Sequence, residues 1–177
     1  MAENETYWYA MKVFYNKVFE IEDYLNEQEI KSYIPCDEKE VKAKDGTRKT
    51  VRHAVISSLL FFQSNDEGAQ NVQKELNNRV IVYTQQRDGK KKPARIPKHQ
   101  MDIFILVSSS GEQGLEYFTA DDRKFHEGEH VEVIDGPFKG AEGYIHRIKG
   151  NRRLIVSIEG VCAVATAYIP QPLLKKI

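Results

Sequence analysis

The sequence predicts an α+β protein in two parts, a sheet covered by helices and then a small all-β barrel. In the first part, apolar runs typical of strands alternate with segments whose apolar residues recur at helical spacing. In the second part, short β-branched runs follow one another with glycine turns and no helical periodicity. We therefore expect a first domain over residues 1–107, a linker over 108–125 and a barrel over 126–177.

The first domain begins with a strand and a helix. Thr6–Phe14 (TYWYAMKVF) is rich in aromatic and β-branched residues, as strands are. Asn16 is the expected N-cap of the next segment, where Val18, Ile21 and Leu25 fall at helical spacing. A strand that leads directly into an amphipathic helix indicates the first half of an α/β unit.

A hairpin and a buried strand are expected next, after a short extended piece over Ser32–Pro35. Val41–Val51 is basic and contains Asp45-Gly46, a dipeptide that favours tight hairpin turns because both positions tolerate positive φ. Ala54–Phe62 (AVISSLLFF) is apolar enough for a central strand buried on both faces.

Two helices and one strand complete the first domain. Ser64 or Asn65 can cap a helix, Arg79–Thr84 (RVIVYT) is typical of a strand, and Pro97 stands at a helix-start position. The order β-α-β-hairpin-β-α-β-α predicts helices on an antiparallel sheet and resembles the split-βαβ plan. The apolar positions are Ala69, Val72 and Leu76 in the first helix, and Met101, Phe104 and Ile105 in the second.

The pattern changes after Val107. The Ser/Gly stretch SSSGEQG and the acidic patch through Asp121 and Asp122 lack periodicity, which predicts a linker. Short strands with tight turns and no helix then indicate an SH3-like barrel. Its expected strands are His130–Ile134, Gly143–Lys149, Leu154–Ile158 and Cys162–Ala167.

Charge is balanced overall and uneven locally. A net charge of zero argues against a protein that mainly coats nucleic acid. Residues 1–40 hold ten acids and four bases, residues 41–54 five bases and one acid, and residues 87–100 six bases and one acid. The two basic segments are either solvated loops or fingers that contact a polyanion.

No pattern in the sequence is typical of an enzyme or a metal site. Cys36 and Cys162 are far apart and lack further ligands at zinc spacing. His126 and His130 are four residues apart, but at a loop-to-strand junction this spacing does not bring them together. We expect no catalysis, no cofactor and no metal.

The chain also carries no pattern of a membrane protein. It has no apolar N-terminal leader, and no apolar run approaches the ~20 residues of a membrane span. We expect a soluble cytoplasmic monomer without a membrane partner.

A glycine-punctuated loop, VEVIDGPFKGAEGYIHRIKG, occupies residues 131–150. Gly136, Gly140 and Gly143 are spaced as G-x3-G-x2-G, which fits neither the dinucleotide fingerprint nor the P-loop. The following residues alternate like a strand, whereas a phosphate cradle requires glycines that open a helix. We expect these glycines to supply positive φ and room for a tight turn between strands.

This stretch resembles the KOW module of the NusG family of transcription elongation factors. The first domain supports the resemblance: Trp8-Tyr9 heads the first strand, an amphipathic helix follows, and Tyr33-Ile34-Pro35 comes next. The order of hairpin and apolar strand also resembles the NusG N-terminal domain, so the resemblance covers nearly the whole chain. The matching KOW positions are Val131, Val133, Gly136, Pro137, Phe138, Gly140 and Gly143.

One departure bears on the subtype. Housekeeping members of the family carry Phe-Pro-Gly-Tyr before the central strand, and the matching stretch Val55–Phe62 has Ser-Ser-Leu in place of Pro-Gly-Tyr. This departure resembles the specialised paralogues of capsular-polysaccharide operons, which act as operon-specific antiterminators. Housekeeping NusG is the alternative within the class, and a KOW-containing RNA- or ribosome-binding protein is the alternative of another class.

The resemblance implies a partner and a set of contact residues. The family's N-terminal domain binds the clamp helices of the largest RNA polymerase subunit through an apolar patch and lowers pausing. Such a patch is expected to be compact and exposed, with a few large side chains that contribute most of the binding energy. The alternative is that these residues belong to the ordinary hydrophobic core. The matching positions are Lys12, Val55, Ile56, Leu59 and Phe61.

The resemblance also implies contact with nucleic acid and with a second protein. Specialised members contact the exposed non-template DNA strand near the first helix, where aromatics can stack on bases and a lysine can meet a phosphate. The barrel recruits a termination factor or a ribosomal protein. The nucleic-acid candidates are Tyr15, Asn16, Lys17 and Tyr24, with Arg48, Lys49, Arg52, Lys90, Lys91, Lys92 and Arg95 in the basic loops; the barrel candidates are Phe138, Ile145, Arg147, Arg152 and Arg153.

Overall fold

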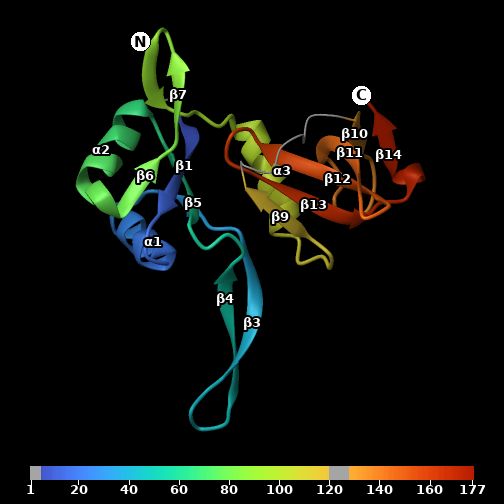
Figure 1. Cartoon of the computed structure of the whole chain (residues 1–177), viewed down its shortest axis with the longest axis horizontal. Helices are drawn as coiled ribbons and strands as arrows, with labels where there is room; N and C mark the ends of the chain where they lie inside the picture. Colours follow the sequence, from blue (N-terminus) through green and yellow to red (C-terminus); the bar gives the residue numbers. More distant parts are fainter. Residues whose placement is uncertain (1–4, 120–127) are drawn as a thin grey trace. The chain divides into compact units, whose positions relative to one another are not determined.

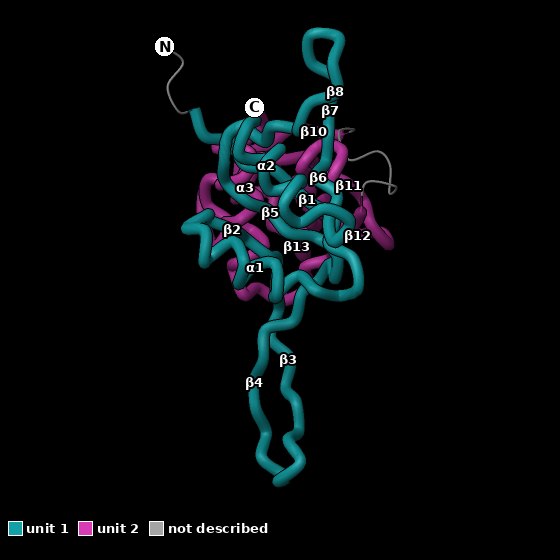
Figure 2. Tube along the Cα trace, turned by 90° about the vertical axis from the view of Figure 1, so that its left-hand side faces the viewer, with its two compact units in different colours: residues 1–97 teal, residues 98–177 magenta. Residues whose placement is uncertain are grey.

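The chain divides into two compact units, which we call unit 1 (residues 1–97) and unit 2 (residues 98–177; Figure 2). The structure, a computed structural model, describes residues 5–119 and 128–177. Asp121, Asp122 and His126, which the sequence places in the linker and barrel entry, lie outside the described residues. The domain boundaries expected from the sequence stay a prediction.

Unit 1 is built on a four-stranded antiparallel sheet with the order β2-β5-β1-β6 (Figure 1). In the pairing of β1 with its two neighbours, Lys12 lies opposite Leu59 on one side and opposite Ile81 on the other. The strands are β1 (Tyr7–Val13), β2 (Ser32–Tyr33), β5 (Leu59–Ser64) and β6 (Val80–Val82).

Both α-helices of unit 1 pack on one face of this sheet. They are α1 (Val18–Glu27) and α2 (Asp66–Leu76), and η1 (Asn77–Arg79) follows α2. The apolar positions predicted by helical spacing are buried, because they share one core with alternate residues of the strands. This core contains Val18, Ile21 and Leu25 of α1, Ala69, Val72 and Leu76 of α2, and Tyr9, Met11, Val13, Leu60, Phe62, Val80 and Val82 of the sheet.

The helix caps follow the sequence at one helix and depart from it at the other. The side chain of Asn65 accepts a hydrogen bond of 2.8 Å from the backbone N–H of Gly68, so Asn65 caps α2 as predicted. At α1 the N-cap is Lys17, without a side-chain cap. The prediction of Asn16 as cap is wrong, because Asn16 has φ 55° and belongs to the preceding turn.

Two hairpins project from unit 1, on opposite sides of its body in both views (Figures 1 and 2). The first, which we call the arm, pairs β3 (Cys36–Lys42) with β4 (Arg48–Ala54). Its turn is closed by Asp45, whose carboxylate accepts hydrogen bonds from the backbone and hydroxyl of Thr47. The second pairs β7 (Thr84–Arg87) with β8 (Lys90–Pro93) and carries the second basic segment.

The apolar strand of the first domain is shorter than expected. The sequence predicts a strand over Ala54–Phe62, whereas Val55–Ser58 forms a turn between β4 and β5. The backbone N–H of Leu59 donates to the Ile56 carbonyl over 3.1 Å. This turn redirects the chain from the arm into the centre of the sheet.

Over its described residues, 98–119 and 128–177, unit 2 contains one α-helix and a six-stranded antiparallel sheet with the order β14-β10-β11-β12-β13-β9. The predicted fold class is confirmed: α+β, with helices on a sheet in the first part and an antiparallel β unit in the second. The elements are α3 (Lys98–Ser108), β9 (Glu116–Thr119), β10 (Glu129–Val133), β11 (Glu142–Ile148), β12 (Asn151–Ile158), β13 (Cys162–Tyr168), η2 (Gln171–Leu173) and β14 (Leu174–Lys176).

Two segments group with unit 2 that the sequence places elsewhere. The helix after Pro97 is α3, and its Gln100 amide donates to the Ser157 carbonyl of β12 over 3.3 Å. Strand β9 lies within the stretch expected as a linker and pairs with β13. The buried Arg153 fixes it further, by donating to the Glu116 carboxylate over 2.9 Å and to the Gly114 carbonyl over 2.7 Å.

Candidate functional site

The face of the unit 1 sheet that points away from α1 and α2 carries the residues that the resemblance assigns to polymerase binding. Leu59 and Phe61 alternate along β5 with the core residues Leu60 and Phe62, so they lie on this second face. Lys12, opposite Leu59 in the register, lies there too. We call this surface the second face; it also includes Trp8, Ala10 and Ile81.

Leu59 and Phe61 are buried in the folded chain, with exposed fractions of 3% and 0%. The expectation of an exposed apolar patch at these two positions is therefore wrong for the folded chain. Neighbouring positions of the second face are buried as well: Ala10, opposite Phe61 in the register, and Trp8 are 1% and 3% exposed.

The accessible part of the second face lies beside them, on β1 and β6. Ile81 is 55% exposed, and the neighbouring Lys12 is exposed as well. Val55 and Ile56 are half-buried in the turn before β5. Sequence reasoning missed Ile81, although alternation in RVIVYT sets it apart: Val80 and Val82 lie in the core, so the residue between them points the other way.

A strained turn after β1 displays an aromatic side chain. Tyr15 and Asn16 both adopt left-handed backbone conformations, with φ 61° and 55°, and the side chain of Tyr15 is 84% exposed. Such a conformation costs a non-glycine residue about 1–2 kcal/mol. Lys12 Nζ lies 5.9 Å from the ring centroid of Phe14, whose ring is 6.4 Å from that of Tyr15. The turn thus places the exposed ring of Tyr15 next to Phe14, which in turn lies near the ammonium group of Lys12.

The other two candidates near α1 have partners within unit 1. Lys17 Nζ lies 3.0 Å from a Glu20 carboxylate oxygen. The hydroxyl of Tyr24 donates to the Glu75 carboxylate of α2, which draws the Tyr24 ring toward the other helix. Tyr15 is therefore the most accessible aromatic of this group.

The three candidates on the arm differ in their surroundings. Lys49 is exposed on β4. Arg48 Nη1 lies 3.8 Å from a Glu40 oxygen, and both side chains are well exposed. Arg52 at the base of the arm is bound to Glu22 of α1, and its guanidinium lies 4.8 Å from the ring centroid of Phe19.

The second basic hairpin is tied to α2 through Asp66. This carboxylate accepts from the Tyr9 hydroxyl over 2.7 Å and from Nη2 of both Arg87 and Arg95 over 2.9 Å. Burial alone would raise the pKa of Asp66, but the hydrogen bonds from Arg95, Tyr9 and Arg87 hold it well below its usual range. Burial and the bond to Asp66 raise the pKa of Tyr9. Arg95, assigned to nucleic acid by sequence, thus has a structural partner.

The glycine loop of unit 2 has the structure that the sequence predicts. Gly136 and Gly140 have φ 87° and 91°, and Gly140 N–H donates to the Val133 carbonyl over 2.8 Å. A Cβ at Gly143 would overlap the carbonyl oxygen of Ile155 on the next strand. The first two glycines supply positive φ and the third supplies room, so the structural interpretation of the loop is confirmed.

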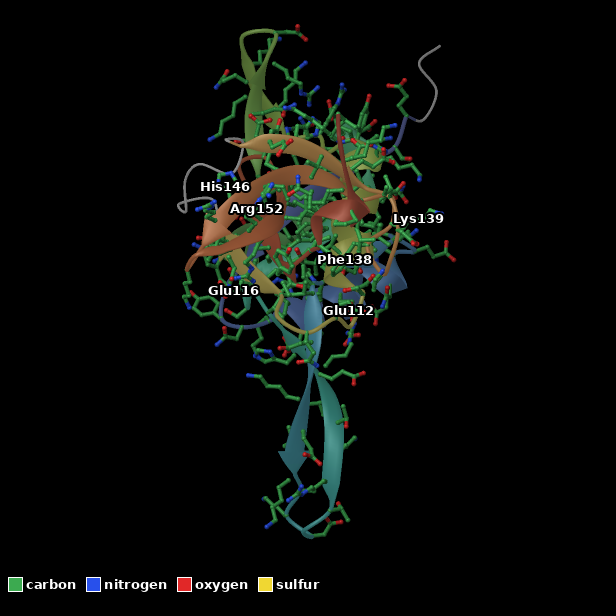
Figure 3. The ribbon with its side chains drawn as sticks, turned by 90° about the vertical axis from the view of Figure 1, so that its right-hand side faces the viewer. Glu112, Glu116, Phe138, Lys139, His146 and Arg152 are labelled. Carbon is green, nitrogen blue, oxygen red and sulfur yellow. The ribbon has the colours of Figure 1, made fainter. Side chains whose placement is uncertain are left out.

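The barrel candidates separate into core and surface. Phe138, labelled with Arg152 in Figure 3, is only 8% exposed and belongs to the interior, as does Arg153. Their assignment to a partner surface is wrong because both side chains point into unit 2. Arg147 is exposed, and Arg152 donates to the Gln171 side chain over 2.9 Å at the surface.

In the described parts of the chain, no group of three or more His, Cys, Asp or Glu side chains could hold a metal ion. None of the helices in residues 5–119 and 128–177 has the length and apolar character needed to cross a membrane.

Comparisons with known proteins identify a family and find similar solved structures. Residues 6–105, more than half of the 177, match the sequence model of the family described as NusG, transcription termination factor. No curated protein matches. A solved structure entitled "Domain interaction in Thermotoga maritima NusG" is 17% identical, covers 98% of each chain and has a TM-score of 0.45. On the family match, this chain belongs to the NusG family of transcription factors.

Proposed function

We propose that this protein is a transcription elongation factor that binds RNA polymerase through unit 1 and promotes antitermination on particular operons of the capsular-polysaccharide type. Proteins of the NusG family bind RNA polymerase, and this supports the partner. The Ser57-Ser58-Leu59 sequence, where housekeeping members carry Pro-Gly-Tyr, supports the specialised role.

The observation that carries this proposal is the asymmetry of the unit 1 sheet. Both α-helices of residues 5–97 pack on the same face, so the second face presents Leu59, Phe61 and Ile81 away from them. A sheet face that carries large apolar side chains and no helix offers a surface to which a protein partner can bind. Polymerase clamp helices would lie along the row of Leu59, Lys12 and Ile81.

The proposal requires a specific order of contacts. Ile81 and Lys12 are exposed and can meet the polymerase first. Leu59 and Phe61 are buried in the folded chain and contribute only if they become accessible on binding. Ile56 and Val55, half-buried in the adjoining turn, extend the same surface.

Two further contacts belong to the proposal. The exposed ring of Tyr15, beside Asn16 and Lys17, would stack on an unpaired base of the non-template strand. Unit 2 would act as a KOW-type module that recruits a termination factor or a ribosomal protein, with Arg147 at its surface.

Capture of purified core RNA polymerase by the immobilised full-length chain tests the polymerase contact. Ile81→Asp places a charge on the accessible part of the second face, and we expect capture to fall at least tenfold. Ile134→Asp is the matched control, because Ile134 is a similarly exposed isoleucine, 44% accessible, in unit 2. Equal capture by both variants would refute docking through this face. Retention of RNA without polymerase would instead favour a KOW-containing RNA-binding protein.

Transcription in vitro separates the specialised from the housekeeping role. The protein is added to polymerase on two templates, one that carries the leader of its own operon and one that does not, each with a downstream terminator. We expect readthrough to rise on the first template only. An equal response on both would support housekeeping NusG.

A further inference from the structure

The arm is a long two-stranded hairpin that joins the rest of unit 1 at its base. Each of its strands contains seven residues, which at ~3.3 Å per residue gives a length of about 20 Å beyond the sheet. Near the base, the Val55 N–H donates to the Pro35 carbonyl over 3.0 Å. Two strands joined at one end can swing as a body, so the angle at the base determines where the tip lies.

Arg52 joins the base of the arm to α1 by three contacts. Its Nη2 donates to Glu22 Oε1 over 2.5 Å, and its Nη1 lies 3.4 Å from Oε2 of the same carboxylate. The guanidinium also lies 4.8 Å from the ring centroid of Phe19. A two-pronged carboxylate bond combined with stacking on a ring fixes the guanidinium in both distance and plane.

The other end of this contact is held firmly. The side chain of Glu22 is only 16% exposed, compared with 53% for Arg52. On either side of it, Ile21 and Leu25 anchor α1 in the core between helices and sheet. The contact therefore ties the arm to a rigid part of unit 1.

The second hairpin has an attachment of the same kind. Arg87, the last residue of β7, and Arg95, just beyond β8, both bind Asp66 at the start of α2. Arg95 lies at the base of its hairpin, whereas Arg87 lies opposite Lys90, next to the turn. At the base of both hairpins, then, an arginine that the basic composition would assign to a polyanion, Arg52 or Arg95, is bound to a helix carboxylate. The exposed lysines Lys44 and Lys90 lie toward the turns.

We propose that Arg52 is a positioning residue, which fixes the direction of the arm through Glu22 and does not itself contact nucleic acid. The polyanion contact falls to exposed lysines farther along the arm, Lys44 and Lys49. A swing of 10° at the base would move the tip of a ~20 Å arm by about 3.5 Å, enough to break a contact made there. The identity of the partner at the tip rests on the proposed function. The contact between Arg52 and Glu22, which we call the clamp, does not.

The clamp and a direct phosphate contact predict opposite effects at Glu22. If Arg52 contacted a phosphate, Glu22→Gln would remove a competing acid and leave binding unchanged or tighter. If Arg52 is held by Glu22, then Glu22→Gln and Arg52→Gln release the same contact. Arg52→Lys separates the two cases further. Lysine keeps the positive charge, but it loses the two-pronged hydrogen bonding and the planar stacking of the guanidinium.

Backbone ¹⁵N relaxation of the full-length chain tests the clamp without any partner. We expect order parameters of the turn residues 44–47 to fall from about 0.8 to below ~0.6 in both glutamine variants and in Arg52→Lys, while those of β1 stay near ~0.85. Arg48→Gln is the control: it removes the outer pair with Glu40 and should leave the turn unchanged. Unchanged order parameters in Arg52→Gln, even with a lower melting temperature, would overturn the positioning role.

Affinity for an elongation complex, assembled from core RNA polymerase and a DNA–RNA scaffold, tests the consequence. We expect Glu22→Gln and Arg52→Gln each to weaken binding about fivefold, and the double variant to be no weaker than either, because both disable one contact. Weaker binding by Arg52→Gln with normal binding by Glu22→Gln and Arg52→Lys would identify a direct phosphate contact and refute the proposal. If the native chain does not bind polymerase, the proposed function fails, and the relaxation result still decides the clamp.

Discussion

Replacing Asp66 by asparagine removes the charge at the centre of the contacts that join the second hairpin to unit 1. Three donors converge on this carboxylate, from Tyr9, Arg87 and Arg95. Hydrogen bonds to charged groups contribute about 1.5–3 kcal/mol each. The Asp66 and Arg95 side chains are 26% and 38% exposed, so screening by solvent lowers the contribution of these hydrogen bonds. Since asparagine keeps one acceptor oxygen, we expect a loss of roughly 3 kcal/mol in the free energy of unfolding.

The effect depends on pH in a direction that follows from the lowered pKa of Asp66. The carboxyl of an unfolded chain titrates near ~3.9, and in the folded chain its pKa lies well below that value. The stabilisation is therefore complete above about pH 5 and is lost as the pH falls through the folded value. Asp66→Asn should show a smaller loss of stability between pH 5 and pH 3 than the native chain does.

Urea unfolding of the full-length chain at pH 7, pH 5 and pH 3 measures both quantities, with unit 1 followed through the fluorescence of Trp8. For a unit of 97 residues, 3 kcal/mol corresponds to a melting temperature lower by about 12–24 °C. Asp88→Asn is the control, since Asp88 is 90% exposed and 3.7 Å from Lys92. A difference below ~1 kcal/mol at pH 7, or parallel pH profiles for native and variant chains, would refute the reasoning.

Three further predictions concern other parts of the chain. Tyr15→Gly removes a side chain from a backbone with φ 61°, so thermal unfolding should show unchanged stability or a gain of up to ~1 kcal/mol. Crosslinking of this variant to non-template DNA should fall. A clear loss of stability would contradict the backbone strain at Tyr15. Gly143→Ala should destabilise unit 2 by more than ~2 kcal/mol in urea unfolding, because its Cβ meets the Ile155 carbonyl; a neutral result would show that the strands can separate. Burial raises the pKa of the Cys162 thiol to about 12, so iodoacetamide at pH 8 should modify it only after unfolding and should modify Cys36 first; rapid labelling of native Cys162 would contradict its burial.

Local patterns were sufficient for much of unit 1. Helical spacing located α1 and α2 because each buries one stripe on the sheet, as Val18 and Val72 do. The Asp45-Gly46 dipeptide located the turn of the arm, since Gly46 has φ 87°. The glycine loop was equally readable, because positive φ and close approach leave few residues other than glycine.

The remaining features depend on partners far apart in the chain. Strand β9 pairs with β13, and its Glu116 accepts a hydrogen bond from Arg153, 37 residues away. A local sequence pattern does not predict such long-range pairing. For the same reason composition assigned Arg52 to a polyanion: its partner Glu22 lies 30 residues away on another element. Basic composition locates an arm but does not distinguish the residues that hold it from those that reach outward.

The candidate polymerase surface was predicted only in part. Alternation along β5 separates Leu59 and Phe61 from the helix-facing core. Leu59 and Phe61 are buried on the second face, whereas Ile81 of the edge strand β6 is exposed. The family resemblance placed the patch on β5, and no local pattern gives this difference in exposure, because the burial of a side chain depends on what packs against it from elsewhere in the chain.

Photocrosslinking from the second face tests the central claim most directly. Benzoylphenylalanine is placed at position 81, or at the exposed position 134 of unit 2 as the control, and each protein is irradiated in complex with elongating RNA polymerase. We predict that position 81 crosslinks to the largest polymerase subunit and that position 134 does not. A complex that forms normally without a crosslink from position 81 would contradict the assignment of this face.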